Sequence, residues 1–415
     1  MLNKIRILTI FFVIPVFFLI GINQTFAQQR KRGAYLKKLI QENRNHTIEK
    51  EISPNIKMIM AGGAFPQWSA TTNKITYTKK KGNRYEVFVM DADGNNEQCL
   101  TCEKAALVNC GNRGQSYWHP SDKYIVFSAE NANLKRNGLG VTARPGLGRN
   151  FNVWVMTTDG NNFWQLTDYP ENWGVIETKF SHDGTKIYWN EEYSMEKYPQ
   201  GKPEDPTPHP GSYWGRENFR YRKGEEICAW RVVYADISFE GGTPKMSNVK
   251  KINPPAGYTL IEANGFTPDD KGFVYDYDIL AETYGVCMWG EIFTSDLDGN
   301  NLKRITNTPL KYNEDPVYSP DGKKLAFKEA TKGKGMPEDG MELIIANADG
   351  SNRKQITHFS DPGAAEYRQD WMQIAEIDWS PDGKKLIFGM ARGNKQAPKV
   401  DINADLYIIT LPEDF

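Results

Sequence analysis

A short strand-turn-strand pattern recurs along this chain of 415 residues. Its clearest copy spans residues 313–327 (NEDPVYSPDGKKLAF), where apolar and polar residues alternate after the turn. Leu325 and Phe327 fall on the same side of such a strand, which is the period of a half-buried strand. Asp321-Gly322 predicts a two-residue hairpin turn, because that turn requires positive φ angles. The segment is therefore expected to form two adjacent antiparallel strands.

Six copies of this pattern are present, and some of them are degenerate. They begin at Pro66, Gln115, Glu177, Glu262, Asn313 and Glu376. Each copy has a second half, an apolar strand with an Asp-Gly turn and a short strand closing on Leu-Thr or Ile-Thr, and residues 85–101 (YEVFVMDADGNNEQCLT) show it clearly. Four short antiparallel strands per repeat are typical of β-propeller blades. The predicted fold is all-β, a six-bladed β-propeller with four-stranded antiparallel blades.

The repeats also predict where each blade begins and ends. The six blades are expected at 65–101, 114–167, 175–252, 261–306, 313–357 and 375–411. The residue before each Ser-Pro-Asp-Gly equivalent is aromatic in all six copies, and such a ring is best placed between adjacent blades. These residues are Trp68, Trp118, Phe180, Phe266, Tyr318 and Trp379.

The sixth blade lacks a fourth strand in sequence order, which would leave its outer edge unpaired. Open edges expose a row of backbone donors and acceptors, so a propeller is expected to cover them. Residues 56–60 (IKMIM) precede the first blade and belong to none of its four strands. We therefore expect this N-terminal segment to pair with residues 405–409 and to close the ring, so that the propeller domain spans 56–415.

The first 27 residues have the pattern of a signal peptide. Basic residues precede the apolar run 7–22, and small residues occupy the −3 and −1 positions before Gln28. A transmembrane anchor is the alternative, but the run is short and broken by Pro15. We expect cleavage after residue 27, no membrane anchor on the mature chain, a lead-in over 28–55, and a periplasmic or secreted protein.

Charge gives no global reason to expect a nucleic-acid partner. The chain has 51 basic and 52 acidic residues, a formal net charge of -1.

Five cysteines are present, and in an oxidising compartment the cluster Cys99, Cys102 and Cys110 is predicted to contain one disulfide. The others are Cys228 and Cys287. A zinc site would need a fourth ligand that the sequence does not supply.

The repeated motif, an aromatic residue followed by Ser-Pro-Asp-Gly-Lys-Lys, resembles the TolB-like propeller repeats of bacterial envelope proteins over about residues 56–411. The resemblance implies the fold and leaves the activity open, since such propellers serve as binding platforms, peptidase gates and polysaccharide lyases. This chain departs from known proteins with TolB-like propellers in two respects. About 30 residues separate the leader from the first blade, too few for the amino-terminal domain of TolB, and no Gly-x-Ser-x-Gly elbow occurs.

Strand alternation predicts that one face of the ring is plain and the other elaborated. The Asp-Gly turns share one face, and the long insertions share the other, where binding residues usually gather. Several innermost strands begin with acidic residues on that elaborated face. These candidate binding residues are Glu177, Glu262, Glu314, Asp315 and Glu376.

Carboxylates around a channel mouth would favour cations, amines, hydroxyl-rich ligands or a divalent metal bound through oxygen. The alternative is that each caps a loop amide or pairs with a lysine across the rim.

A second set of candidate binding residues lies in the long insertion of the third blade. Aromatic rings interleaved with arginines suit stacking on sugars and pairing with carboxylates, although a subunit contact would use the same residue types. The set is His209, Tyr213, Trp214, Arg216, Arg220 and Arg222. With only five histidines in the chain, neither a catalytic residue nor a metal ligand is assigned.

The sequence predicts an exported binding platform for a protein or glycan ligand on the long-loop face. A polysaccharide-degrading enzyme of lyase-like type, with an acidic or metal-assisted site on the same face, is the alternative. A structural part of a larger envelope assembly is the third reading. Whether the chain is an enzyme, which cofactor it uses and how it oligomerises stay open.

Overall fold

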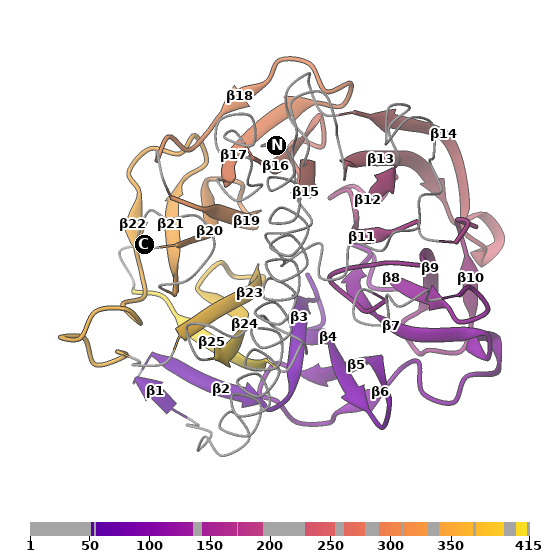
Figure 1. Cartoon of the computed structure of the whole chain (residues 1–415), viewed down its shortest axis with the longest axis horizontal. Helices are drawn as coiled ribbons and strands as arrows, with labels where there is room; N and C mark the ends of the chain where they lie inside the picture. Colours follow the sequence, from indigo (N-terminus) through magenta and orange to yellow (C-terminus); the bar gives the residue numbers. More distant parts are fainter. Residues whose placement is uncertain are drawn as a thin grey trace, which may run out of the picture. The chain divides into compact units, whose positions relative to one another are not determined.

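The chain forms six antiparallel sheets arranged in a ring, a six-bladed β-propeller (Figure 1). The computed structural model describes residues 51–53, 55–135, 143–171, 173–193, 229–253, 261–278, 290–308, 311–330, 340–367, 371–393 and 404–412. Helical structure in this part of the chain is limited to two short 3-10 turns, η1 (Ala105–Leu107) and η3 (Glu240–Gly242). No helix among these residues is long and apolar enough to cross a membrane.

The first three blades follow one another in sequence order. Blade 1 contains β3 (Gly63–Trp68), β4 (Lys74–Lys81), β5 (Arg84–Asp91) and β6 (Gln98–Cys99). Blade 2 contains β7 (Cys110–Trp118), β8 (Tyr124–Asn131), β9 (Phe151–Thr157) and β10 (Phe163–Gln165). Blade 3 contains β11 (Val175–Phe180), β12 (Lys186–Tyr193), β13 (Ala229–Ser238) and β14 (Lys245–Ile252).

The second half of the ring repeats this order until the last blade. Blade 4 contains β15 (Ile261–Phe266), β16 (Gly272–Asp278), β17 (Gly290–Asp296) and β18 (Lys303–Arg304). Blade 5 contains β19 (Asn313–Tyr318), β20 (Lys324–Ala330), β21 (Met341–Asn347) and β22 (Lys354–Gln355). Blade 6 contains β23 (Trp371–Trp379), β24 (Lys385–Gly393) and β25 (Asp405–Thr410), completed by β2 (Ile56–Met60) and β1 (Glu51–Ser53).

The N-terminal strand closes the ring as the sequence predicts. β2 pairs antiparallel with β25, and Ile56 lies opposite Ile409 while Met58 lies opposite Tyr407. In Figure 1 the indigo β2 accordingly lies beside the yellow β25. β1 adds a fifth strand outside β2, which the sequence pattern did not predict.

The expected two-residue hairpin turn is wrong. In blade 5 the Ser319 N–H donates to the Lys324 carbonyl oxygen at 2.9 Å, so the loop enclosed by this hydrogen bond has four residues, 320–323. Within residues 319–323 of this loop, Gly322 alone has a positive φ, 69°. The Ser319 hydroxyl donates to Asp321 Oδ1 (2.7 Å) and accepts the Lys324 N–H (2.9 Å). Serine and aspartate therefore hold a longer loop through side-chain bonds to the backbone.

The hydrophobic core lies mainly between neighbouring blades. The aromatic residue before each turn occupies this space as predicted, and Trp379 of blade 6 packs with Ala326 and Ile345 of blade 5. Trp379 Nε1 also donates to the Val317 carbonyl oxygen at 3.1 Å, so the indole joins the two blades by a hydrogen bond as well.

The closing Leu-Thr of the repeat has a structural reason. In blade 1 the Thr101 hydroxyl accepts the Val87 N–H (2.9 Å) and donates to Glu86 Oε2 (2.7 Å). The same arrangement recurs in three further blades with Thr167 and Asn152, Thr306 and Glu291, and Thr357 and Glu342. The threonine therefore fastens the outermost segment of the blade to its third strand.

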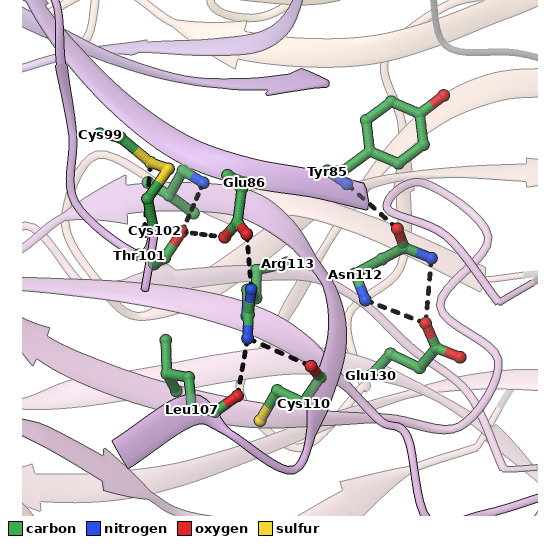
Figure 2. Close-up of polar contacts among 11 residues, drawn as sticks. Tyr85, Glu86, Cys99, Thr101, Cys102, Leu107, Cys110, Asn112, Arg113 and Glu130 are labelled. Atoms are coloured by element: carbon green, nitrogen blue, oxygen red, sulfur yellow. Dashed lines mark hydrogen bonds and ion pairs between the residues drawn. A yellow bond between two sulfur atoms is a disulfide. The ribbon is translucent and has the colours of Figure 1, made fainter. Parts of the chain in front are cut away.

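The connection between blades 1 and 2 contains the predicted disulfide, Cys99–Cys102 (Figure 2). Cys110 is a free, buried cysteine, and burial raises the pKa of its thiol to about 11. Figure 2 also shows Arg113 of blade 2, whose Nη1 donates to Glu86 Oε1 (2.6 Å) and whose Nη2 donates to the Leu107 carbonyl oxygen (2.6 Å). This arginine joins the two blades below the disulfide.

Candidate functional site

The innermost strand of every blade is interrupted by a β-bulge. These strands, β3, β7, β11, β15, β19 and β23, lie nearest the centre of the ring in Figure 1. A bulge bends a strand and re-aims a side chain. The residues at the six register shifts include Phe65, Gln115, Glu177, Asn264, Asp315 and Glu376.

Five of the six bulge residues have a positive φ although none is a glycine. The angles are 53° at Phe65, 47° at Gln115, 52° at Glu177, 54° at Asp315 and 38° at Glu376. Residues with a side chain rarely adopt this conformation, and such backbone strain collects at functional sites. Because this conformation recurs around the ring, the backbone strain is a property of the repeat. The blades differ in the side chain that occupies the bulge position.

Blade 1 presents an apolar side chain at this position. Phe65 packs against Ala64, Ala391 and Ala404. It also fills the space beside Gly146, where an added Cβ would lie 2.7 Å from Phe65 Cζ. The centre of the ring is therefore apolar beside blade 1, whereas blades 2 to 6 contribute polar bulge residues.

Glu177 of blade 3 is fully buried and held from two blades. Gln115 Nε2 donates to its Oε1 at 2.8 Å, and the Tyr117 hydroxyl donates to its Oε2 at 2.9 Å. Lys179 Nζ lies 3.6 Å from the same Oε2. Lys179 in turn donates to the Asn264 carbonyl oxygen of blade 4 at 2.7 Å, so one ammonium group bridges blades 3 and 4.

A second buried ammonium group, Lys328, holds two carboxylates of blade 5. Its Nζ lies 2.8 Å from Glu314 Oε2 and 2.5 Å from Asp315 Oδ2. Burial alone would lower the pKa of Lys328, but the carboxylates of Asp315, Glu314 and Glu376 outweigh it and raise that pKa. Asp315 Oδ2 also accepts the Glu376 backbone N–H at 3.2 Å, which links blade 5 to blade 6.

Blade 4 contributes a buried carboxyl group. With its amide oriented to satisfy its neighbours, Asn264 Nδ2 donates to Asp276 Oδ1 at 3.0 Å and to the Glu262 carbonyl oxygen at 2.9 Å. Burial raises the pKa of Asp276 well above its usual range, and the nearby carboxylates of Glu262, Glu314 and Asp315 raise it further.

Glu376 of blade 6 is half-buried and electrostatically coupled to blades 3 and 5. Burial, together with the Asp315 and Glu177 carboxylates, raises the pKa of Glu376 well above its usual range, and Lys179 and Lys328 offset part of this effect. Blades 3 and 6 are opposite in a six-membered ring, so this interaction requires that the side chains approach its axis. We call the polar side chains near this axis the axial cluster. Its members are Gln115, Tyr117, Glu177, Lys179, Tyr188, Glu262, Asp276, Glu314, Asp315, Lys328 and Glu376.

The axial cluster carries an excess of carboxyl groups among the described residues. The carboxyl groups are Glu177, Glu262, Asp276, Glu314, Asp315 and Glu376, and the ammonium groups are Lys179 and Lys328. Glu177, Glu262, Glu314 and Asp315 are buried, and Lys179 or Lys328 lies against three of these four carboxylates. Buried carboxylates must be paired or protonated, which explains the two lysines and the raised pKa values.

Three polar groups of the axial cluster have no partner within the described part of the chain. The Glu376 carboxylate accepts neither a hydrogen bond nor an ion pair there. The Tyr188 hydroxyl and Gln115 Oε1 are buried without a hydrogen-bond partner. Burial raises the pKa of Tyr188 well above its usual range, and the Glu177 and Glu376 carboxylates raise it further.

The axial cluster lies away from the Asp-Gly turns. In blade 5 Glu314 pairs with Lys328, whereas the turn follows the pair Tyr318 and Leu325 at the other end of the hairpin. Glu376 lies between the pairs Ala375–Gly389 and Ile377–Phe388, again beyond the turn end of its strand. The acidic residues are therefore displaced toward the end of the ring where the long connections leave.

The other predicted binding residues lie outside the described residues. They are His209, Tyr213, Trp214, Arg216, Arg220 and Arg222. Within the described ranges, no group of three or more histidine, cysteine, aspartate or glutamate side chains is arranged to hold a metal ion.

Sequence reasoning found five acidic residues of the axial cluster but missed its other members. These are Gln115, Tyr117, Lys179, Tyr188, Asp276 and Lys328. One signal was available for Lys179, since residues two apart on a regular strand share a face. Tyr188, Asp276 and Lys328 come from the second strands of their blades, where the sequence pattern indicated no candidate binding residue.

No family model matches this chain, and no curated protein matches it. Solved structures to which it is similar include TolB from Acinetobacter baumannii, with 15% identity, 86% of this chain and 65% of that chain covered, and a TM-score of 0.46. The chain thus spans less than two thirds of that protein.

Two further similar structures cover more of their own length. The putative TolB from Agrobacterium tumefaciens has 14% identity, with 85% of this chain and 91% of that chain covered and a TM-score of 0.45. An oligogalacturonate lyase in complex with manganese has 12% identity, with 89% and 96% covered and a TM-score of 0.48. TolB-like propellers are thus among the solved structures that this chain resembles.

Proposed function

We propose that this chain is an exported binding platform that holds a protein or glycan ligand at the end of the ring carrying the long connections, through a cationic group received by the axial cluster. The observation that supports it is the unpartnered polar groups at the axis. Buried polar groups are normally hydrogen-bonded, and each exception calls for an explanation. A ligand group that enters the axis would supply the missing partners.

The charge of the axial cluster favours a cationic ligand group. Glu177 is held by Gln115, Tyr117 and Lys179, whereas Glu376 has no such support in the described chain. An unpaired carboxyl group among other carboxylates attracts positive charge, and an acidic site steers cationic ligands toward it. The rigid blades position these groups before the ligand arrives, which lowers the entropic cost of binding.

The proposal is tested by screening the immobilised full chain against basic and neutral peptides and against a glycan array. Any ligand found is then titrated against the Glu376→Lys variant, which adds an ammonium group of its own at the axis. We expect at least a tenfold loss of affinity, the order of an interaction with a charged group. Asp298→Asn, at an exposed carboxylate paired with Lys250, is the matched control. Equal binding by the Glu376→Lys variant would exclude the axis as the site.

A polysaccharide-degrading enzyme is the second candidate. It is favoured by the raised pKa values of Glu376 and Asp276, because a carboxyl group whose pKa is raised holds its proton to higher pH and can act as a general acid. Incubation with acidic and neutral polysaccharides, with and without manganese, should then release new chain ends. Loss of that release in the Glu376→Gln variant, with binding retained, would favour the enzyme over the platform.

The export part of the proposal rests on residues 1–27. Expression of the full chain in a bacterial host should yield a mature protein that begins at Gln28 and is recovered outside the cytoplasm. An intact leader on a membrane-bound product would instead favour an anchor.

A further inference from the structure

The axial cluster already shows how it accommodates a positive charge. Both described cations of the cluster are lysines, and each contacts two acceptors, which lie on one strand for Lys328 and on strands of two blades for Lys179. Lys328 Nζ contacts Glu314 and Asp315 at 2.8 and 2.5 Å. Lys179 Nζ contacts the Glu177 carboxylate and donates to the Asn264 carbonyl oxygen. The site therefore binds ammonium groups as part of its own fold.

The unpartnered groups form a third set of acceptors of the same kind. They come from three blades, with Gln115 Oε1 from blade 2, the Tyr188 hydroxyl from blade 3 and the Glu376 carboxylate from blade 6. Gln115 and Tyr188 are at least nine-tenths buried, with exposures of 1% and 0%. The Gln115 amide is fixed by its Nε2, which donates to Glu177 Oε1 at 2.8 Å, and the Glu177 and Glu376 carboxylates both raise the pKa of Tyr188.

We infer, building on the proposed function, that the ligand group received at the axis is an alkylammonium, bound by the Glu376 carboxylate with the Tyr188 hydroxyl and Gln115 Oε1 as further acceptors. An ammonium has three rotatable donors and suits acceptors that converge from separate strands. A guanidinium prefers the two oxygens of one carboxylate in a planar fork.

A divalent metal ion fits less well, because the described residues include no group arranged to hold one. A lysine side chain, a free amino terminus or an amino sugar would all supply an alkylammonium. The axial cluster would therefore select a cation by its shape as well as by its positive charge.

Binding of the ammonium is linked to pH through the groups that face Glu376. Asp315 of β19 and Glu177 of β11 oppose its ionisation, and Lys179 of β11 and Lys328 of β20 favour it. Asp378 of its own strand and the hydroxyls of Tyr117 and Tyr188 are further titratable groups near Glu376. Because Glu376 must release its proton to pair with the cation, affinity should rise as pH increases through the raised pKa of Glu376.

The test uses small probes and the full mature chain, with calorimetry or protein-observed NMR as the readout. Butylammonium should bind, and butylguanidinium, butyltrimethylammonium, butanol and calcium should each bind at least about tenfold more weakly, the order expected from loss of a charge-assisted hydrogen bond. The affinity for butylammonium should increase with pH.

Substitutions test whether butylammonium binding depends on these particular acceptors or only on the negative charge of the axial cluster. Glu376→Gln should lower butylammonium affinity about tenfold or more and remove its pH dependence, and Tyr188→Phe should lower affinity several-fold. Asp298→Asn is the control and should change neither the affinity for butylammonium nor its pH dependence. A pH-independent affinity, unaltered binding in Glu376→Gln, or equal binding of butylguanidinium or calcium would overturn the inference.

The outcomes for the two proposals differ. If a peptide or glycan from the screen binds at the axis while butylammonium does not, the alkylammonium assignment is wrong and the binding platform stands. If no ligand of any class binds the full chain, the platform itself is wrong, and if a ligand binds Glu376→Lys equally well, the axis is excluded as its site.

Discussion

At the scale of single residues, the repeat works through a few polar side chains that hold the backbone. The closing threonine of blade 5 accepts the Leu343 N–H (2.9 Å) and donates to Glu342 Oε2 (2.6 Å). Thr357 and Glu342 are both fully buried. Glu342 also accepts the N–H groups of Phe359 and Ser360 at 3.0 and 2.8 Å. One short motif therefore satisfies several groups that water cannot reach.

Replacing Thr357 with valine should destabilise the protein although the side-chain shape is nearly conserved. The Leu343 N–H would lose its acceptor and Glu342 would lose a donor, and each unsatisfied buried group costs about 1–3 kcal/mol. Urea denaturation should show this decrease in the free energy of unfolding. Thr357→Ser keeps the hydroxyl and is the control; equal losses in both variants would mean that methyl packing, not hydrogen bonding, stabilises the blade.

At the scale of elements, the last blade depends on a strand from the other end of the chain. Ile56 is 1% exposed and packs in the core between blades 5 and 6. The backbone of β2 covers β25, and β1 covers β2. The ring is thus closed by hydrogen bonds between segments about 350 residues apart in sequence, which makes its stability sensitive to both ends.

Deleting residues 28–62 should lower the melting temperature of the whole ring. The deletion removes β1 and β2, exposes the edge of β25 and empties the site of Ile56, and an isoleucine deletion from a core costs about 2–5 kcal/mol by itself. Differential scanning calorimetry measures the effect. A shorter deletion of residues 28–48 leaves both strands in place and should melt like the full mature chain. Identical melting of the two deletions would contradict closure by β2.

At the scale of the whole molecule, the inner strands of blades 3 to 6 bring carboxyl groups from separate blades to one axis. Burial raises the pKa values of Asp276, Glu314 and Glu376, and these shifts all act in the same direction on stability. The native state keeps protons that the unfolded chain releases, so stability falls as pH rises between the unfolded and folded pKa values. Asp378, on the innermost strand of blade 6, shows the same effect, because burial raises its pKa from 3.8 to about 6 while the Trp68 N–H offsets part of the shift.

Asp378→Asn should therefore flatten the dependence of stability on pH. In the original protein the contribution of Asp378 is full below pH 3.8 and is lost as pH rises through about 6. Melting temperatures measured across this window should decline less with pH in the variant.

Asp382→Asn is the matched comparison, because hydrogen bonds from Ser380 and the Lys384 N–H lower the pKa of Asp382. Its stabilisation is present above the unfolded pKa and is lost as pH falls, so this variant should show a change of the opposite sign. A change of the same sign in both variants would contradict the assignment.

The pattern of the sequence was sufficient for the architecture. Period-2 alternation, turn residues and a six-fold repeat specify four-stranded blades, and the missing fourth strand of blade 6 identified residues 56–60 as its replacement. These features are local, or are copied along the chain, so they can be read without knowing which residues meet. The details that failed were also local. Serine and aspartate side chains hold a four-residue loop where Asp321-Gly322 suggested a tighter turn.

Only the tertiary structure decided what the acidic residues do. The sequence placed Glu177, Asp315 and Glu376 at the starts of inner strands, around a channel mouth. A β-bulge in each of these strands turns the side chains toward the axis, where Lys328 and Tyr117 reach Asp315 and Glu177 from other strands. A linear pattern does not encode such distances, because burial and charge pairing are set by segments far apart in the chain.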